Sequence, residues 1–307
     1  MITTFDDARW RSSPDAVRDA LESNRIVYFP TCPVPLPDQA TLDFLRRELP
    51  SRLKLKNISY HPEAGKVSGI EADAATTSRV TDLLRSHLND VSSFLRRVTG
   101  DLTDGARVGT CSFRPIEEKG RNLKPHASNE LVHVDAGAYG ATNGDRLLRF
   151  FVNVNADRDR VWATKGTFEE LLERYGRKAG LLSESGQLAV SITKGGADRA
   201  FSALVAGLAH LNPLATVLDS SPYDRAMRRL HNYMKDDEAF KSDLTGYQEV
   251  RFPPGTAWTV FTDGVSHASL EGQYALVTTM IVRRARMRWP ERAPFNTLLG
   301  RASTSAA

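Results

Sequence analysis

The chain has 307 residues, of which 41% are apolar, and its formal net charge is +4. This length and apolar content suffice for a sizeable buried core. The small basic excess is spread along the chain, which argues against the concentrated basic patch of a nucleic-acid-binding protein. The two cysteines, Cys32 and Cys111, are too few for a disulfide framework and form no Cys-x-x-Cys pair. We therefore expect a folded protein of a reducing compartment, with no nucleic-acid partner.

The N-terminal segment MITTFDDARWRSSPDAV carries acidic residues early and lacks the basic start and apolar core of a secretory signal. No window approaches the roughly 20 uninterrupted apolar residues that span a bilayer. We expect a cytoplasmic protein whose contact with a membrane is peripheral.

Helical patterning dominates the first part of the chain. The segments 13–23 (SPDAVRDALES) and 36–50 (LPDQATLDFLRRELP) begin near Ser or Asp residues that can cap a helix, and VYFP between them is a candidate strand. Residues 76–99 repeat apolar side chains at the three-to-four spacing of an amphipathic helix. The segment NISYHPEAGKVSG is rich in turn formers and predicts a loop. We predict that residues 1–106 form a helical layer that packs on the rest of the chain.

Short runs of β-type residues dominate from residue 107 onward. These runs are VGTCSFRP, LVHVDA, LLRFFVNVNA, YQEVRFPP, TAWTVFTDG and QYALVTTMIV. Two helical insertions, near residues 167–178 and 222–240, interrupt the series, and strict βαβ alternation is missing. We predict a single domain with a mainly β fold and flanking helices. Its core, residues 107–307, is expected to be a double-stranded β-helix, the jelly-roll or cupin-like fold of many oxygenases.

The tripeptide His133-Val134-Asp135 is the first candidate for a metal site. Alternate residues of a strand point to the same face, so His133 and Asp135 would converge. Such a tripeptide also arises by chance, and a core histidine beside a turn-forming aspartate is the alternative interpretation. A third ligand, His267, follows the apolar run in PPGTAWTVFTDGVSHASL. We expect His231, on a predicted helix, to pack in the core or lie on the surface.

Two histidines and one carboxylate predict a particular kind of metal centre. This set leaves three adjacent coordination positions open, which suits Fe(II) with a bidentate cosubstrate and O2. Zinc would prefer a closed tetrahedral set, and no fourth ligand is evident nearby. The pattern therefore predicts a non-haem Fe(II) centre, for which we consider 2-oxoglutarate as the bidentate cosubstrate.

A buried cation is also needed for the distal carboxylate of 2-oxoglutarate, and arginine binds a carboxylate best. One face of the run LLRFFVNVNA is apolar, and the other carries Arg149 and Asn153. Polar residues on a barrel strand are costly unless they line a site, so we predict that these two bind the cosubstrate. A rim arginine on an exposed face is the alternative. Many oxygenases place this cation about ten residues after the second histidine, at Val277 and Thr278 here, so Arg283 is the second candidate.

Several longer motifs occur in an order and spacing that resemble one enzyme family. They are KNISYHPEAGKVSG, SFRPIEEKGR, LVHVDA, LLRFFVNVNADRDRVW, SPYDRAMRRLHNYMKDDEAF, RFPPGTAWTVFTDGVSHASLEGQY and PFNTLLGR. Together they run from residue 56 to the end of the chain. The sequence resembles the Kdo hydroxylases, the Fe(II)/2-oxoglutarate/O2-dependent enzymes that hydroxylate 3-deoxy-D-manno-octulosonic acid (Kdo) in the inner core of lipopolysaccharide.

The resemblance implies both the ligands and the substrate. It implies that His133, Asp135 and His267 bind iron. It also implies that Arg114, Arg121 and Arg149 lie where the family keeps arginines. The implied substrate is a lipid A precursor that already carries Kdo, met at the cytoplasmic face of the bacterial inner membrane.

The chain departs from the family pattern after Asp135. Where the family commonly has Phe-Pro-Ser and a basic loop, this chain has the segment 137–144, GAYGATNG. Because this loop adjoins the iron, the same chemistry on another anionic small molecule is an alternative function. A catalytically silent binding barrel is a further alternative, against which the intact ligand set argues.

Two basic clusters predict anionic partners. SFRPIEEKGRNLK supplies Arg114, Lys119 and Arg121 just before the His-Val-Asp run, and we predict that they bind substrate anions. The C-terminal segment 283–295, RRARMRWPERAPF, holds five arginines around Met287 and Trp289, which predicts docking on an anionic bilayer. An ordinary solvated basic tail is the alternative. The sequence leaves the oligomeric state open.

Overall fold

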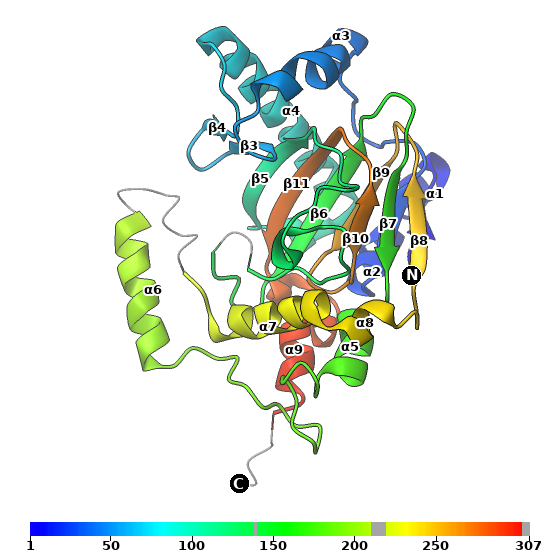
Figure 1. The fold of residues 1–307 in the computed structure, drawn as a ribbon. Helices are drawn as coiled ribbons and strands as arrows, with labels where there is room; N and C mark the ends of the chain where they lie inside the picture. Colours follow the sequence, from blue (N-terminus) through cyan, green and yellow to red (C-terminus); the bar gives the residue numbers. More distant parts are fainter. Residues whose placement is uncertain (138–139, 210–218, 303–307) are drawn as a thin grey trace.

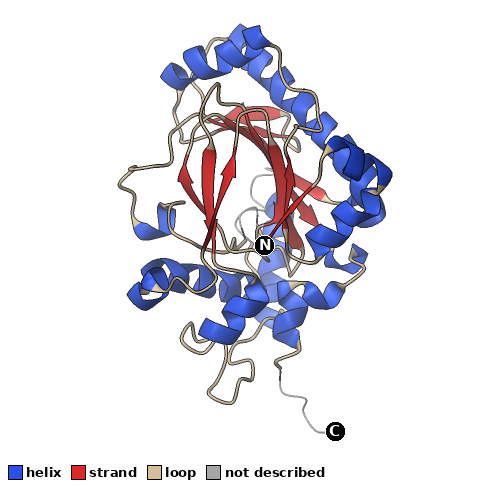
Figure 2. Ribbon diagram, turned by 90° about the vertical axis from the view of Figure 1, so that its right-hand side faces the viewer, coloured by secondary structure: helices blue, strands red, loops and turns tan. Residues whose placement is uncertain are grey.

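The protein forms two β-sheets that face each other, with helices around them (Figure 2). The structure is a computed structural model that describes residues 1–137, 140–209 and 219–302. The larger sheet contains, in spatial order, β1 (Ile2–Thr4), β2 (Ile26–Phe29), β9 (Ala257–Phe261), β6 (Arg146–Asn153), β11 (Ala275–Val282), β5 (Arg107–Arg114), β3 (Ile58–His61) and β4 (Lys66–Ser68). The smaller sheet contains β10 (Ala268–Glu271), β7 (Arg160–Thr164) and β8 (Gln248–Phe252). This arrangement confirms the predicted double-stranded β-helix.

The outer face of the larger sheet is covered by the N-terminal helices (Figure 1). These helices are α1 (Asp7–Ser12), α2 (Pro14–Glu22), α3 (Gln39–Asp43) and α4 (Ala74–Thr99). Strand β6 shows why one sheet can serve two environments, since alternate side chains point to opposite faces. Leu148, Phe150 and Val152 pack in the helix-covered core, whereas Phe151 packs between the two sheets. The inner face is therefore left for the cavity between the sheets.

The N-terminal 106 residues contribute strands as well as the predicted helices. VYFP forms most of β2, as predicted, and β2 pairs with β9. The prediction of a loop over NISYHPEAGKVSG is wrong, because this segment forms the β3–β4 hairpin, which extends the sheet beyond β5. Ile58 and Tyr60 are buried, and their spacing of two is the strand signal within a segment otherwise rich in turn formers.

The second half of the chain also differs from the expected elements in four places. LVHVDA is extended but forms only one isolated bridge, between His133 and His267. Strands β7 and β10 and helix α6 (Gly196–Ala209) are not among the expected elements. Helices α5 (Phe168–Tyr175), α7 (Pro222–Asp236) and α8 (Glu238–Ser242) lie in the insertions, and α9 (Pro294–Leu299) is close to the C-terminus.

A buried ion pair fixes the loop that joins β9 to β10. The fully buried Arg146 donates from Nε to Asp263 Oδ2 at 2.7 Å and from Nη2 to Asn24 Oδ1 at 2.7 Å. Asp263 Oδ1 also accepts the backbone N–H of Leu147. A Cβ atom on Gly264 would lie 2.2 Å from Asn24 Oδ1, so only glycine fits at this position. These contacts place the start of the segment that leads to His267.

We predict that Arg146→Met lowers the free energy of unfolding by ~3–5 kcal/mol, because it leaves the buried Asp263 without its charge partner. Arg85→Met is the control, since Arg85 and its partner Asp82 form an exposed pair and should contribute less than about 1 kcal/mol. Chemical denaturation monitored by circular dichroism measures both variants. Equal small losses in the two would contradict the prediction.

Candidate metal centre

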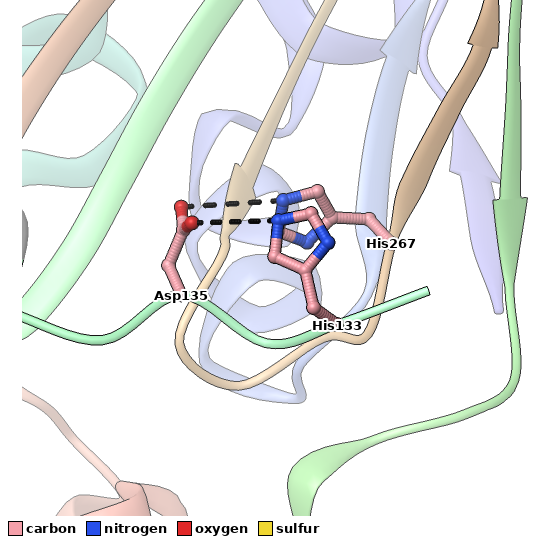
Figure 3. Close-up of side chains that lie close together, drawn as sticks. All are labelled: His133, Asp135 and His267. Atoms are coloured by element: carbon pink, nitrogen blue, oxygen red, sulfur yellow. Dashed lines mark ion pairs between the residues drawn. The ribbon is translucent and has the colours of Figure 1, made fainter. Parts of the chain in front are cut away.

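His133, Asp135 and His267 converge on one point at the inner edge of the two sheets (Figure 3). The segments carrying the two histidines exchange backbone hydrogen bonds, from His133 N to His267 O at 3.0 Å and from His267 N to His133 O at 2.8 Å. Asp135 Oδ1 lies 3.8 Å from His133 Nε2, and its Oδ2 lies 4.0 Å from His267 Nε2. One ligand atom from each residue lies within 4.8 Å of the others, which is close enough for a single metal ion.

Hydrogen bonds on the far side of each ring orient both histidines for metal binding. Nδ1 of His133 lies 2.7 Å from the Leu131 carbonyl oxygen, and Nδ1 of His267 lies 3.0 Å from that of Val265. Because a carbonyl only accepts, both Nδ1 atoms carry the proton and both Nε2 atoms present a lone pair. Burial lowers the pKa of His267 to about 4 and that of His133 well below its ordinary value, so both rings are neutral, as metal ligands must be.

Arg149 forms an ion pair with the third ligand. Its Nη2 lies 2.9 Å from Asp135 Oδ2, and both side chains are largely buried. Burial alone would raise the pKa of Asp135, but the charge of Arg149, together with smaller contributions from groups that include the Thr262 side chain, holds the pKa below its ordinary value. Within the described part of the chain, Asp135 Oδ2 accepts no hydrogen bond. The carboxylate is therefore ionised and has a lone pair for a metal ion, so the three residues fit an Fe(II) centre.

The triad opens into a cavity of about 360 Å3. Five basic side chains line it: Lys56, Arg114, Arg149, Arg160 and Lys235. Asp135 is the acidic side chain that faces them. Burial lowers the pKa of Lys56 and brings that of Lys235 to about 8. So strong an excess of positive charge in a partly enclosed space fits anionic ligands.

The deep wall of the cavity comes from β7 and β10. Arg160 is buried, and its Nη2 donates to Ser269 Oγ at 3.1 Å while its Nη1 donates to the Gly272 carbonyl at 3.2 Å. Glu118 Oε1 lies 3.6 Å from Arg160 Nη2. The Trp162 ring stacks on His267, with centroids 5.1 Å apart. Arg160 Nε and Trp162 Nε1 are buried donors without an acceptor in the described chain, so this wall offers unused hydrogen bonds to a ligand.

Helix α7 forms the facing wall, with two residues one turn apart. His231 Nδ1 lies 2.8 Å from the Val134 carbonyl oxygen, and the ring centroid lies 4.9 Å from that of His133. Lys235 Nζ donates to the Ser128 carbonyl at 2.8 Å. His231 therefore packs on His133, as expected, and it also lines the cavity, a position that the expectation did not include. The spacing of His231 and Lys235, four residues apart on one helix, is the sequence signal that marks this face.

Two of the predicted cofactor-binding residues lie outside the cavity. The Asn153 amide nitrogen donates to the carbonyls of Arg158 and Phe252, which connects β6 to β8. Arg283 is exposed and lies against Gly105, next to the Arg107 end of the β5–β11 pair. The cavity lies at the opposite end of β5, beside Arg114. Of the three predicted cofactor-binding residues, the structure brings Arg149 alone to the cavity.

The predicted substrate-binding cluster is divided in the same way. Arg114 lines the cavity. Lys119 is exposed and forms an ion pair with Glu271. Arg121 Nη1 lies 3.3 Å from Glu118 Oε2, and its charge contributes to the lowered pKa of Lys56. Arg121 therefore acts on the cavity through its field rather than as a lining residue.

The unusual loop after Asp135 is attached to α7 on its described side. Residues 138 and 139 lie outside the described residues. Thr142 donates from its backbone N–H and its hydroxyl to Asp224 Oδ1, at 3.2 and 2.5 Å. Asp224 also completes the capping box that starts α7, together with Ser221. The loop and the α7 wall therefore share one anchoring carboxylate.

The fold and the ligand set define a class of protein. Two histidines and one carboxylate between the sheets of a double-stranded β-helix are the centre of a non-haem iron oxygenase. The family model "3-deoxy-D-manno-oct-2-ulosonic acid (Kdo) hydroxylase" matches residues 5–304, and the chain belongs to this family. No curated protein sequence matches the chain.

Solved structures agree with this assignment. The chain is similar to the Kdo hydroxylase KdoO, a non-heme Fe(II) alphaketoglutarate-dependent dioxygenase, in complex with alphaketoglutarate and Fe(III), at 27% identity and a TM-score of 0.79. The KdoO complex with cobalt(II) matches equally well, and the complex with succinate and Fe(III) matches at 26% identity and a TM-score of 0.78. Each match covers 100% of this chain and 98% of the other.

We predict that His133→Ala, Asp135→Ala and His267→Ala each weaken Co(II) or Fe(II) binding by more than about 100-fold while the fold persists. Equilibrium dialysis under anaerobic conditions measures the affinity, and circular dichroism reports the fold. His61→Ala is the control, because His61 hydrogen-bonds Ser68 in the β3–β4 hairpin, outside the cavity. Unchanged affinity in any one ligand variant would remove that residue from the centre.

Proposed function

We propose that the protein is an Fe(II)- and 2-oxoglutarate-dependent dioxygenase that hydroxylates the Kdo sugar of a Kdo-bearing lipid A precursor. The observation that carries this proposal is the ligand triad at the base of a cation-lined cavity. Both organic substrates are anions, since 2-oxoglutarate has two carboxylates and Kdo has one. The cavity therefore has the charge that the two ligands require, and the family assignment supplies the sugar.

The iron, when bound, would supply the activation of O2 and couple it to the oxidative decarboxylation of 2-oxoglutarate. The chain's own residues hold, orient and enclose the reactants. His133, Asp135 and His267 would hold the metal with three protein ligands, a set that leaves coordination positions for the cosubstrate and O2. Arg149 keeps Asp135 ionised, and the Trp162 ring excludes water beside His267.

The position of Arg149 favours another arginine as the anchor of the distal carboxylate. Arg149 touches a metal ligand, so it would lie nearer to the metal-chelating end of 2-oxoglutarate than to its distal carboxylate. Arg160 lies on the deep wall beside Ser269 and Trp162, and its Nε, like that of Arg149, lacks an acceptor in the described residues. We infer that Arg160 binds the distal carboxylate and that Arg149 positions Asp135. The assignment of Arg149 as the anchor stays a prediction that the same experiment tests.

Arg160→Lys is expected to raise the KM for 2-oxoglutarate by roughly 10- to 100-fold with a smaller change in kcat, because a lysine cannot replace the planar guanidinium. Arg149→Lys is expected to change the affinity for the metal more than the KM for 2-oxoglutarate. Succinate formation gives both kinetic constants. Binding of 2-oxoglutarate to the Co(II) protein, measured by calorimetry, gives a readout independent of turnover. The reverse pattern in the two variants would make Arg149 the anchor.

Three further cations that line the cavity can bind the sugar carboxylate. Lys56, which precedes β3, and Lys235 on α7 approach from separate parts of the chain, and Arg114 lies at the end of β5. Partial burial strengthens the interaction of such cations with an anion. We infer that these three side chains select a carboxylate-bearing sugar and hold it over the metal. Lys119 and Arg121 are then outer contributors to the positive field.

The proposed substrate is lipid-borne, so the protein must meet a membrane. None of the described helices combines the length and the apolar content needed to cross one. We propose peripheral contact at the inner face of the inner membrane. The C-terminal arginines are partly engaged within the chain: Arg288 pairs with Asp15 and Asp19 at 2.7 and 3.0 Å, and Arg286 lies 3.6 Å from Asp101. Docking through this segment stays a prediction.

The test of the function is substrate-dependent turnover. The purified protein with Fe(II) and ascorbate is expected to convert 2-oxoglutarate to succinate faster when Kdo-lipid A is added, and mass spectrometry should find one added oxygen on Kdo. Asp135→Ala is the inactive control. Succinate formation without an oxidised Kdo product, but with oxidation of another anionic small molecule, would favour the alternative substrate. An absence of turnover with every substrate, despite bound metal, would favour a silent binding barrel.

A further inference from the structure

Helix α6 exposes large apolar side chains along one stripe. Phe201 is 49% exposed, Leu204 61% and Leu208 44%, at positions i, i+3 and i+7 of the helix. Asp198 and Arg199, both near the start, are the two charged residues among its 14. In Figure 1, α6 stands apart from the two sheets. An apolar stripe of this kind on a water-exposed helix marks an interaction surface.

The polar face of α6 is attached to the protein, which fixes how the helix is presented. Ser202 Oγ accepts from Lys194 Nζ at 2.5 Å and donates to Asp219 Oδ1 at 2.9 Å. Asp198 forms an ion pair with Arg225 of α7 at 2.8 Å. Ser202 and Asp198 are one helical turn apart, on a different side from the apolar stripe. These contacts turn the stripe away from the polar anchor.

Helix α7 adds positive charge to this surface. Arg225, Arg228 and Arg229 are exposed at positions i, i+3 and i+4, so they form a basic stripe on one face. The other face of α7 carries His231 and Lys235 into the cavity. One helix therefore joins the catalytic cavity to the basic stripe, and the Arg225–Asp198 ion pair joins the basic stripe to α6.

We propose that the apolar stripe of α6 and the basic stripe of α7 together dock the protein on an anionic lipid bilayer. The inference rests on the proposed function in one respect, namely that the sugar is lipid-borne. Exposed apolar side chains on α6, together with exposed arginines on the helix to which α6 is ion-paired, are the composition of a surface that lies in a membrane interface. The helix is about 21 Å long, too short to span the roughly 30 Å hydrocarbon core and suited to lying along its surface. Charge complementarity favours a bilayer over a second copy of this chain, whose same surface would bring arginines together.

Vesicle co-sedimentation of the full chain tests the docking. The wild-type protein should bind vesicles of phosphatidylcholine with phosphatidylglycerol more strongly than vesicles of phosphatidylcholine alone. Leu204→Gln/Leu208→Gln should weaken binding by about tenfold or more, because two side chains leave the apolar phase. Arg228→Gln should weaken binding to the anionic vesicles by about fivefold and leave binding to neutral vesicles unchanged.

Matched control variants carry the same changes elsewhere. Leu244→Gln/Leu299→Gln alters two exposed leucines outside α6, and Arg97→Gln alters an exposed arginine of α4. Both should bind vesicles as the wild type does. Equal losses in the α6 variant and its control would overturn the proposal. Light scattering tests whether a second copy of the chain covers this surface instead. If the wild type is a dimer and the α6 variant is a monomer that still binds vesicles normally, the surface is an interface between copies.

Activity separates the docking proposal from the proposed function. On a water-soluble Kdo glycoside without acyl chains, Leu204→Gln/Leu208→Gln should turn over like the wild type, because α6 does not line the cavity. On Kdo-lipid A in anionic vesicles, the same variant should be about tenfold slower at limiting substrate. Vesicle binding that depends on α6, without oxidation of any Kdo substrate, would sustain the docking and refute the function. Oxidation of both substrates at wild-type rates by the variant would refute the docking and sustain the function.

Discussion

The pair of backbone hydrogen bonds between His133 and His267 is the contact on which the centre depends. It joins two segments that are 134 residues apart in the sequence and sets both imidazoles side by side. A shift of one residue in this pairing would turn one ligand to the opposite face. Asp135 N donates to the Thr262 carbonyl at 2.9 Å, so the third ligand is set against the same loop. The buried Arg146–Asp263 pair fixes that loop from behind.

Charge decides what this geometry can hold. Burying several cations together costs free energy, because each loses hydration and repels the others. Part of that cost is offset within the chain, by Asp135 for Arg149 and by Glu118 for Arg160. Lys56 and Lys235 face the cavity, and the pKa of each is lowered because its charged form is disfavoured there. An anionic ligand would offset the repulsion among these cations, so its binding would also stabilise the charged cavity.

The sequence predicts structural features best where they depend on the regular spacing of side chains along a strand or helix. The spacing of His133 and Asp135, the alternation in β6 and the amphipathic stripe of α4 each predict a structural feature correctly, because each depends on neighbours along the chain. The same reasoning could not find Arg160, His231 or Lys56 as cavity residues. They come from a strand, a helix and a loop that only tertiary packing brings together.

Two further differences between the prediction from the sequence and the structure have local causes. The β3–β4 hairpin is hidden by turn-forming residues in a short segment, and its strands form because β5 offers a free edge to pair with. Asn153 has the right face for a site but satisfies backbone carbonyls instead, and the sequence does not distinguish these two uses of a buried amide.

The two walls of the cavity come from parts of the chain with different architectures, and this division bears on how such enzymes diverge. The deep wall consists of paired strands, where Arg160, Trp162 and Ser269 are held by the ladder between β7 and β10. The facing wall consists of a helix and connecting segments, and the Asp224 carboxylate binds both α7 and the loop after Asp135. Substitutions and insertions in the second wall leave the strand ladder intact. A lineage can therefore reshape the acceptor side of the cavity while the strands that carry Arg160 and Trp162 stay unchanged.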